Sequence, residues 1–286
     1  MDYLKKEGEG QTIRLPSVAN LMIDALDRDI DVYPSPFEFQ ITKQANLQNG
    51  FFTRIAATEV VLEWCEPNIN GEVNNREIAI DISGVGIFSV QLPIGFYTVE
   101  QTLDAIVDRL NVQSGTTGCT FSIVQAGRAT VLDCSGGDFF VMESPLGNQL
   151  EFPTDDTYRP QQPVGNCPDL RLVRYLDFVS EQLTYAQKVK DTATNPYDRN
   201  VLLRWYMAWD EQPQLDGYGF PILMGYTDFV ARRLFSPPKQ IRWENTIPIG
   251  NLGFSVYNED GVIMTEVAPS ALYSTSFLMT LQLSEN

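Results

Sequence analysis

The sequence predicts a mainly β fold built from antiparallel strands. Apolar and polar residues alternate along many short segments, such as residues 37–42, 77–82 and 252–256, and this pattern is typical of strands with one buried face. Glycine and proline residues interrupt the chain between these segments, as expected for turns. The clearest helical spacing lies at residues 99–112. We therefore expect sheets with one ordered amphipathic helix packed against them.

Composition is that of an ordinary globular protein. The 286 residues include 43% hydrophobic and 20% charged residues, so the chain can bury a substantial core. No apolar run approaches the roughly 18 residues needed to span a bilayer, and the first residues lack the apolar region of a signal peptide. We expect no membrane span and a protein made in a cytoplasm.

The net charge of −17 disfavours direct nucleic-acid binding, because affinity for phosphate comes mostly from clustered Lys and Arg. One local group in the second half leaves two interpretations open, a basic patch or scattered surface cations. Its members are Arg232, Arg233, Lys239 and Arg242.

Residues 1–35 have the features of an N-terminal arm, with a polar, glycine-containing start. After a candidate cap at Ser17, apolar residues recur with helical spacing, and we predict a short helix. Its stripe must pack on its own domain or on a neighbouring subunit. The stripe contains Val18, Leu21, Met22, Ala25 and Leu26, of which Leu21, Met22, Ala25 and Leu26 are our candidate interface residues.

The end of this arm imitates the spacing of a calcium-binding loop. Acidic residues occupy positions 1, 3, 5 and 12 of that motif, but the sixth position is Val32 rather than the glycine that the sharp turn needs. Pro34 and Pro36 also stiffen the segment. We therefore expect no metal site here. The acidic residues are Asp27, Asp29, Asp31 and Glu38.

The first β-rich region spans residues 36–155 and contains the helix. Thr98 and Gln101 have the spacing of a capping box at its start. A hairpin follows, and a two-residue turn at Ala126-Gly127 would set Cys119 directly opposite Cys134. We expect both to be buried free thiols, with a disulfide as the alternative.

A loop rich in proline and polar residues, 153–168, separates this region from a second one at residues 156–286. There we expect strands at residues 201–210 and 252–258. A tight turn at Asp260-Gly261 should lead to a returning strand at 262–267, and a final strand should end near residue 283.

The chain has no histidine, which excludes Ser-His-Asp and Cys-His catalysis and histidine-containing metal sites. No glycine-rich nucleotide loop occurs at the required spacing, so we expect no cofactor and no enzyme activity. A two-carboxylate glycosidase with a tryptophan sugar platform stays open. Against it, most of the tryptophans lie in predicted strands, where aromatic rings normally fill a core or an interface. They are Trp64, Trp205, Trp209 and Trp243.

The order of several segments from residue 36 to residue 286 resembles jelly-roll capsid proteins of DNA viruses. It is most similar to the penton and minor capsid proteins of virophages, polinton-like viruses and related large eukaryotic DNA viruses. The segments are PSPFEFQI, VQLPIGFYTVEQTLDAIVDRLN, VLLRWYMAWD, GYTDFVARRLFSPPKQIRW and GNLGFSVYNEDG, followed by a last strand.

The resemblance implies an antiparallel jelly-roll sandwich, either a single roll with an insertion or two rolls. It implies a structural virion protein, a penton or minor capsid subunit of an icosahedral shell, as a homopentamer in contact with a larger major capsid protein and other virion proteins. Such a protein would reside in the virion and assemble in the host cytoplasm or nucleus. The alternatives are a double jelly-roll major capsid protein and a carbohydrate-binding β-sandwich module or glycosidase. The length of 286 residues favours the single roll.

Overall fold

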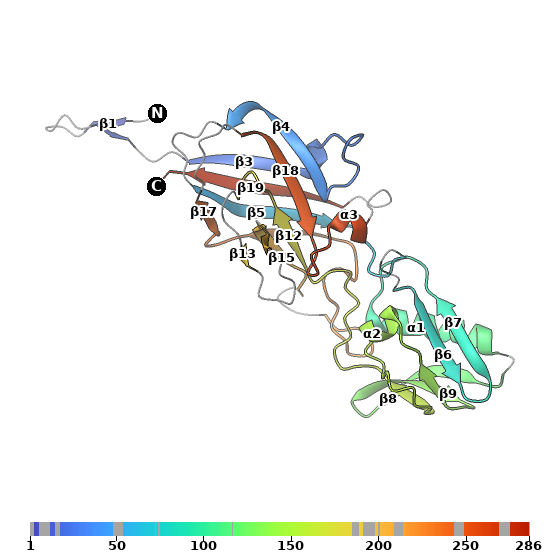
Figure 1. Cartoon of the computed structure of the whole chain (residues 1–286). Coiled ribbons are helices and arrows are strands. Elements are labelled where there is room, and N and C mark those ends of the chain that lie inside the picture. Colours follow the sequence, from blue (N-terminus) through green and yellow to red (C-terminus); the bar gives the residue numbers. More distant parts are fainter. Residues whose placement is uncertain are drawn as a thin grey trace. The chain divides into compact units, whose positions relative to one another are not determined.

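The structure is a computed structural model, and its chain divides into two compact units (Figure 1). The first combines Met1–Trp64, Tyr175–Tyr206 and Val230–Asn286, and the second combines Cys65–Arg174 and Met207–Phe229. Each unit takes segments from both expected regions, 36–155 and 156–286. The residues described are 3–5, 12–14, 18–47, 54–71, 73, 75–115, 117–184, 189–190, 198–199, 201–208, 214–242, 249–268 and 275–285.

Two antiparallel sheets build the first unit. The first sheet has the strand order β16-β5-β19-β3, and the short strand β17 also pairs with β5. The second sheet has the order β15-β12-β18-β4. The strands of the first sheet are β3 (Val18–Asp24), β5 (Arg54–Trp64), β16 (Phe229–Leu234), β17 (Gln240–Arg242) and β19 (Ser276–Ser284). Those of the second are β4 (Glu38–Leu47), β12 (Tyr175–Val179), β15 (Val201–Tyr206) and β18 (Ile249–Tyr257).

This interleaving of strands over two sheets is that of a jelly roll. Apart from β17, successive roll strands change sheet at every step except from β12 to β15, which pair with each other. The earliest strand, β3, and the last, β19, are neighbours in the first sheet. The second unit enters the chain between β5 and β12, with a further segment between β15 and β16. The single roll with an insertion therefore describes the chain. The two-roll alternative is wrong for the described residues, because the second unit there has two three-stranded sheets.

Aromatic rings from both sheets fill the space between them. Phe39 stacks on Phe254 with ring centroids 5.5 Å apart, and Phe277 contacts Phe39 at 5.8 Å and Phe178 at 4.8 Å. These four side chains come from β4, β18, β19 and β12 and are all buried. Such ring pairs stabilise a core beyond the area they bury. The predicted inward face of β18 is confirmed, since Leu252, Phe254 and Val256 are buried.

The helix predicted around residues 18–26 is wrong. Residues 18–24 form β3, which pairs antiparallel with β19 from Val18 opposite Ser284 to Asp24 opposite Leu278. Only the short 3-10 helix η1 (Ala25–Asp27) follows. The spacing of apolar residues fits a strand as well as a helix, and the backbone pairing with β19 decides in favour of the strand.

The turn at Asp260-Gly261 is confirmed, but the returning strand is wrong. Asn258 anchors the turn: its backbone N–H donates to the Val262 carbonyl at 3.0 Å, and its side-chain oxygen accepts from Val262 N–H at 2.8 Å. Gly261 has φ +82°, which favours glycine. After one bridge between Tyr257 and Ile263, the chain forms the short helix α3 (Met264–Val267). It cannot continue as a hairpin because the next strand, β19, belongs to the other sheet.

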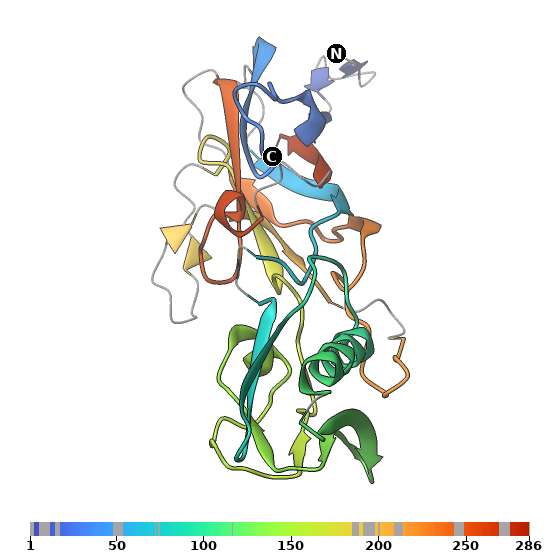
Figure 2. The same ribbon diagram turned by 90° about the vertical axis from the view of Figure 1, so that its right-hand side faces the viewer.

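The second unit packs the predicted helix against small sheets (Figure 2). The helix α1 spans Val99–Ser114, which confirms the prediction. Its capping box is also confirmed, since Gln101 N–H donates to Thr98 Oγ1 at 3.2 Å and Thr98 N–H to Gln101 Oε1 at 3.0 Å. The sheets have the orders β10-β6-β7 and β11-β9-β8. Their strands are β6 (Glu77–Ile82), β7 (Gly86–Gln91), β8 (Thr120–Ala126), β9 (Ala129–Ser135), β10 (Phe139–Val141) and β11 (Gln161–Pro163), and α2 covers Pro145–Gln149.

Short elements complete the described chain. Two pairs of strands stand in sheets of their own, β1 (Tyr3–Lys5) with β2 (Thr12–Arg14) and β13 (Val189–Lys190) with β14 (Asp198–Arg199). No helix among the described residues has the length and apolar character needed to cross a membrane.

The hairpin β8–β9 turns one residue later than predicted. Ala126 pairs with Ala129, so Gly127 and Arg128 form the turn and Phe121, not Cys119, lies opposite Cys134. The residue of β8 that lies opposite a given residue of β9 therefore changes by two positions. Because side chains alternate along a strand, the same side chains still face the core. The expectation of buried free thiols at Cys119 and Cys134 is confirmed. Burial, followed by the neighbouring Cys119, raises the pKa of the Cys134 thiol to about 12.

The helix also protects an edge of the sheet β11-β9-β8. Asn111 of α1 accepts a hydrogen bond from Phe121 N–H of β8 at 2.6 Å and donates one to the Phe121 carbonyl at 2.9 Å. One side chain thus satisfies both backbone groups of an edge residue, as a neighbouring strand would.

We predict that Asn111→Ala lowers the free energy of unfolding by about 1 kcal/mol or more, because both Phe121 groups lose their partner. Urea unfolding checks this. The matched control is Val112→Ala on the same helix, where the side chain is 84% exposed and its loss should have little effect. Equal stability of the two variants would contradict the role of Asn111.

Candidate assembly surfaces

The four predicted interface residues separate into buried and exposed side chains. Ala25 is fully buried and Leu21 is half-buried, so they belong to the fold of the first unit. Met22 and Leu26 are 57% and 62% exposed and are accessible to a partner. The reason is the strand: Met22 lies on the outer face of β3, opposite Thr280 of β19.

Exposed apolar side chains continue from β3 into the loop that joins it to β4. Sequence reasoning missed Ile30 and Val32, which are 60% and 61% exposed. It named Val18, which is 58% exposed, in the stripe but not among the candidate interface residues. Strand alternation could have identified Val18, but the loop residues lie in no periodic pattern. We call residues 26–32 the acidic loop, because Asp27, Asp29 and Asp31 are exposed there.

Arg28 organises this acidic loop. Its guanidinium donates to the carbonyls of Ala25 at 2.7 Å, Tyr33 at 3.0 Å and Pro34 at 3.0 Å. The Asp29 carbonyl also accepts hydrogen bonds from Val32 N–H and Tyr33 N–H, at 3.2 and 2.7 Å. Arginine presents its donors in a rigid fork, so these bonds hold the loop in one shape. A cation of the chain itself thus orders the segment that imitates a calcium loop.

The four basic residues at 232–242, for which a basic patch and scattered cations were both open interpretations, do not form one patch. Arg233 turns inward, where its guanidinium lies 4.6 Å from the Trp205 ring centre and donates to the Tyr206 carbonyl. Lys239 donates to the Val201 carbonyl at 3.1 Å, and burial lowers its pKa. Arg232 and Arg242 are exposed.

These two arginines belong to a second exposed surface, on the outer face of the sheet around β16 and β17. Val230 and Leu234 of β16 are 68% and 64% exposed, and Arg232 between them pairs with Glu59 of β5. Arg242 of β17 stands directly opposite Arg54 of β5, which is also exposed. We call this surface the basic edge, and its residues are Arg54, Val230, Arg232, Leu234 and Arg242.

The two tryptophans that the structure describes do not form the sugar platform that a glycosidase would need. Trp64 and Trp205 are buried, with 1% and 0% of their surface exposed, so they fill the core as expected of a capsid subunit. Trp209 and Trp243 lie outside the described residues. No group of three or more acidic or cysteine side chains among the described residues is placed to hold a metal ion.

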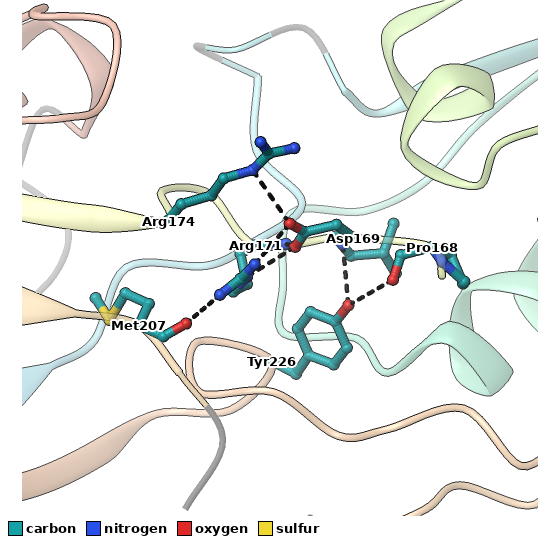
Figure 3. Close-up of polar contacts among 7 residues, drawn as sticks. Pro168, Asp169, Arg171, Arg174, Met207 and Tyr226 are labelled. Carbon is teal, nitrogen blue, oxygen red and sulfur yellow. Dashed lines mark hydrogen bonds and ion pairs between the residues drawn. The ribbon is translucent and has the colours of Figure 1, made fainter. Parts of the chain in front are cut away.

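A polar cluster of the second unit joins the two segments through which the chain leaves it (Figure 3). Asp169 accepts two hydrogen bonds from Arg171, both 2.8 Å long, and pairs with Arg174 at 3.3 Å. Arg171 also donates to the Met207 carbonyl, and Met207 N–H donates to the Arg174 carbonyl at 2.9 Å. The segments 168–174 and 207–229, which precede and follow strands of the roll, are thereby fastened together.

Tyr226 closes this cluster from the second segment. Its hydroxyl accepts from Leu170 N–H at 3.0 Å and donates to the Pro168 carbonyl at 3.3 Å (Figure 3). Burial raises the pKa of Tyr226 to about 12. Burial also acts to raise the pKa of Asp169, but the hydrogen bonds and charge of Arg171, with the charge of Arg174, outweigh it and lower that pKa.

The mavirus penton protein has a similar structure across nearly the whole chain. The TM-score to its crystal structure is 0.51 at 13% sequence identity, covering 95% of this chain and 99% of that one. The chain shares the jelly-roll fold of a penton protein. A chain in the cryo-EM structure of the Sputnik virophage aligns with a TM-score of 0.47 at 13% identity, covering 95% and 98%. No protein-family model and no curated protein sequence matches the chain.

We predict that acid weakens the cluster around Asp169. Because its pKa is lowered in the folded state, the ionised carboxylate contributes fully above about pH 4, the ordinary pKa of aspartate. That contribution is lost as the pH falls through the folded-state pKa. Asp169→Asn should therefore be less stable than the unaltered protein at pH 7, and the difference should shrink below about pH 4.

Urea unfolding at several pH values measures this. Asp156→Asn is the matched control, since Asp156 is exposed in a loop of the same unit and should leave the pH profile unchanged. A stability difference between Asp169→Asn and the unaltered protein that is constant from pH 7 to about pH 3 would contradict the assignment.

Proposed function

We propose that this chain is a penton subunit, a structural protein that occupies the five-fold vertices of an icosahedral virion. The observation that carries the proposal is the structural likeness to the mavirus penton protein, which extends over 95% of this chain and 99% of that one. In this role the protein forms a homopentamer, contacts a larger major capsid protein and other virion proteins, and catalyses no reaction.

The architecture supports a penton rather than a major capsid protein. The described strands of the first unit form one roll, and the second unit, which is inserted in it, has a different topology and does not form a second roll. Exposed apolar side chains on both outer strands of the first sheet, β3 and β16, also fit a subunit with neighbours.

The direct test is the mass of the purified full chain in solution, by size-exclusion chromatography with light scattering. A penton subunit should give a species of five times the chain mass of 32.2 kDa, alone or after addition of the coat protein of the same virus. A chain that stays monomeric in both conditions and is missing from purified particles would refute the proposal.

We also propose that residues 1–17 act as an assembly arm. Among the described residues, the strands β1 and β2 in this segment pair only with each other. A separate two-stranded hairpin is marginally stable in water, so it gains order by docking on another surface. Residues 18–24, by contrast, are part of the roll as β3. The arm that can be removed without damage to the fold therefore ends before Val18, not at residue 35.

We predict that deletion of residues 1–17 changes the melting temperature of the isolated subunit by only about 2 °C and reduces its incorporation into particles. Deletion of residues 1–30 is the contrasting variant, since it removes β3 and exposes β19, and it should unfold at a clearly lower temperature. Normal incorporation of the shorter deletion would contradict the assembly role of the arm.

A further inference from the structure

The acidic loop is ordered before any partner binds, and it exposes apolar side chains that a partner can cover. Three large apolar side chains, Leu26, Ile30 and Val32, are each about 60% exposed, and three carboxylates stand between them. The Arg28 hydrogen bonds fix the loop, so little conformational entropy is lost when a partner covers it. Exposed apolar side chains that gather in one ordered loop are typical of a protein–protein contact.

The basic edge has the opposite charge and a matching apolar content. Val230 and Leu234 are the apolar contacts it offers, and Arg232 lies between them. Arg54 and Arg242 stand directly opposite each other on β5 and β17, and both are exposed. Arg54 also donates a hydrogen bond to Gln240 Oε1 at 2.9 Å. In a chain with a net charge of −17, such a basic surface is suited to an acidic partner.

The two surfaces lie at different parts of the same unit. β3, which leads into the acidic loop, is the outer strand at one edge of the first sheet, and β16 is the outer strand at the other. A contact between two different surfaces of identical subunits is a head-to-tail contact, and it generates a closed ring when the rotation between neighbours closes. This is the type of contact that a five-fold ring requires.

We propose that the acidic loop of one copy docks on the basic edge of the next copy, with Asp27 and Asp31 facing Arg54 and Arg242 and with the apolar side chains of both surfaces in contact. This inference rests on the proposed function, because the ring it builds is that of the penton. Asp29 has a different role, since its side chain accepts a hydrogen bond from Asp31 N–H and shapes the loop.

Charge reversal tests the contact. Asp27→Lys with Asp31→Lys, or Arg54→Glu with Arg242→Glu, should each weaken self-association of the full chain about tenfold or more. The arginine pair is reversed together so that one like-charged pair replaces another within the chain. All four substitutions in one chain should restore association, since the charges are then complementary again.

The matched control is Glu181→Lys, which reverses an exposed carboxylate of the same unit outside both surfaces and should leave association unchanged. Sedimentation velocity over a range of concentrations gives the association constants, and raising salt from about 50 to about 500 mM should weaken the ring of the unaltered chain. Circular dichroism melting shows that each variant is folded.

Three outcomes would overturn the inference. In the first, a ring forms, but its association constant does not change in either charge-reversed variant, or the fourfold variant does not restore it. The proposed contact is then wrong, while the penton proposal still stands. In the second, the reversals block entry into particles while the ring persists, which assigns these surfaces to another virion protein. In the third, the unaltered chain is monomeric at every concentration, which overturns the proposed contact. If the chain is also missing from purified particles, the penton proposal is refuted as well.

Discussion

The fold depends on the position of its last strand. β19 lies between β3 and β5 and pairs with both, so the final residues of the chain join its first roll strand to its third. Its inward side chains, among them Phe277, Met279 and Leu281, are buried against the opposite sheet. Without β19, β3 and β5 would lose their common pairing partner, and Phe39 and Phe178 of the opposite sheet would lose their contacts with Phe277. Because these contacts join residues more than two hundred positions apart, the roll closes only after most of the chain is available, and slow folding is expected.

That constraint explains where the chain tolerates an insertion. The strands of the roll are fixed by pairing with distant partners, whereas the connections between them need only return the chain to the correct strand. The second unit occupies two such connections, β5 to β12 and β15 to β16, and has its own core around α1. The hydrogen bonds among Asp169, Arg171 and Met207 hold the two connections together.

Local signals made half of this fold predictable. The capping box at Thr98 and the stripe along α1 are complete within about 16 residues, and the alternation in β18 is equally local. The failures are non-local. Residues 18–24 suit a helix or a strand, and only pairing with β19 decides between them.

The candidate surfaces were predictable in part for the same reason. Met22 and Leu26 were identified, but from a helical stripe that does not exist. The basic edge needs Arg54 beside Arg242, two residues brought together only by the pairing of β5 with β17. Arg233 left the expected patch because strand alternation turns it toward Trp205, and its neighbours Arg232 and Leu234 turn toward solvent.

We have proposed that this roll occupies the five-fold vertices of a virion. A cryo-EM reconstruction of purified particles that contain the chain tests this, because it shows which protein fills each position of the shell. We expect density for one roll and one inserted unit per subunit, repeated five times around each vertex and nowhere else in the shell. Density for this chain at the quasi-hexagonal positions between vertices, or a vertex filled by another protein, would contradict it.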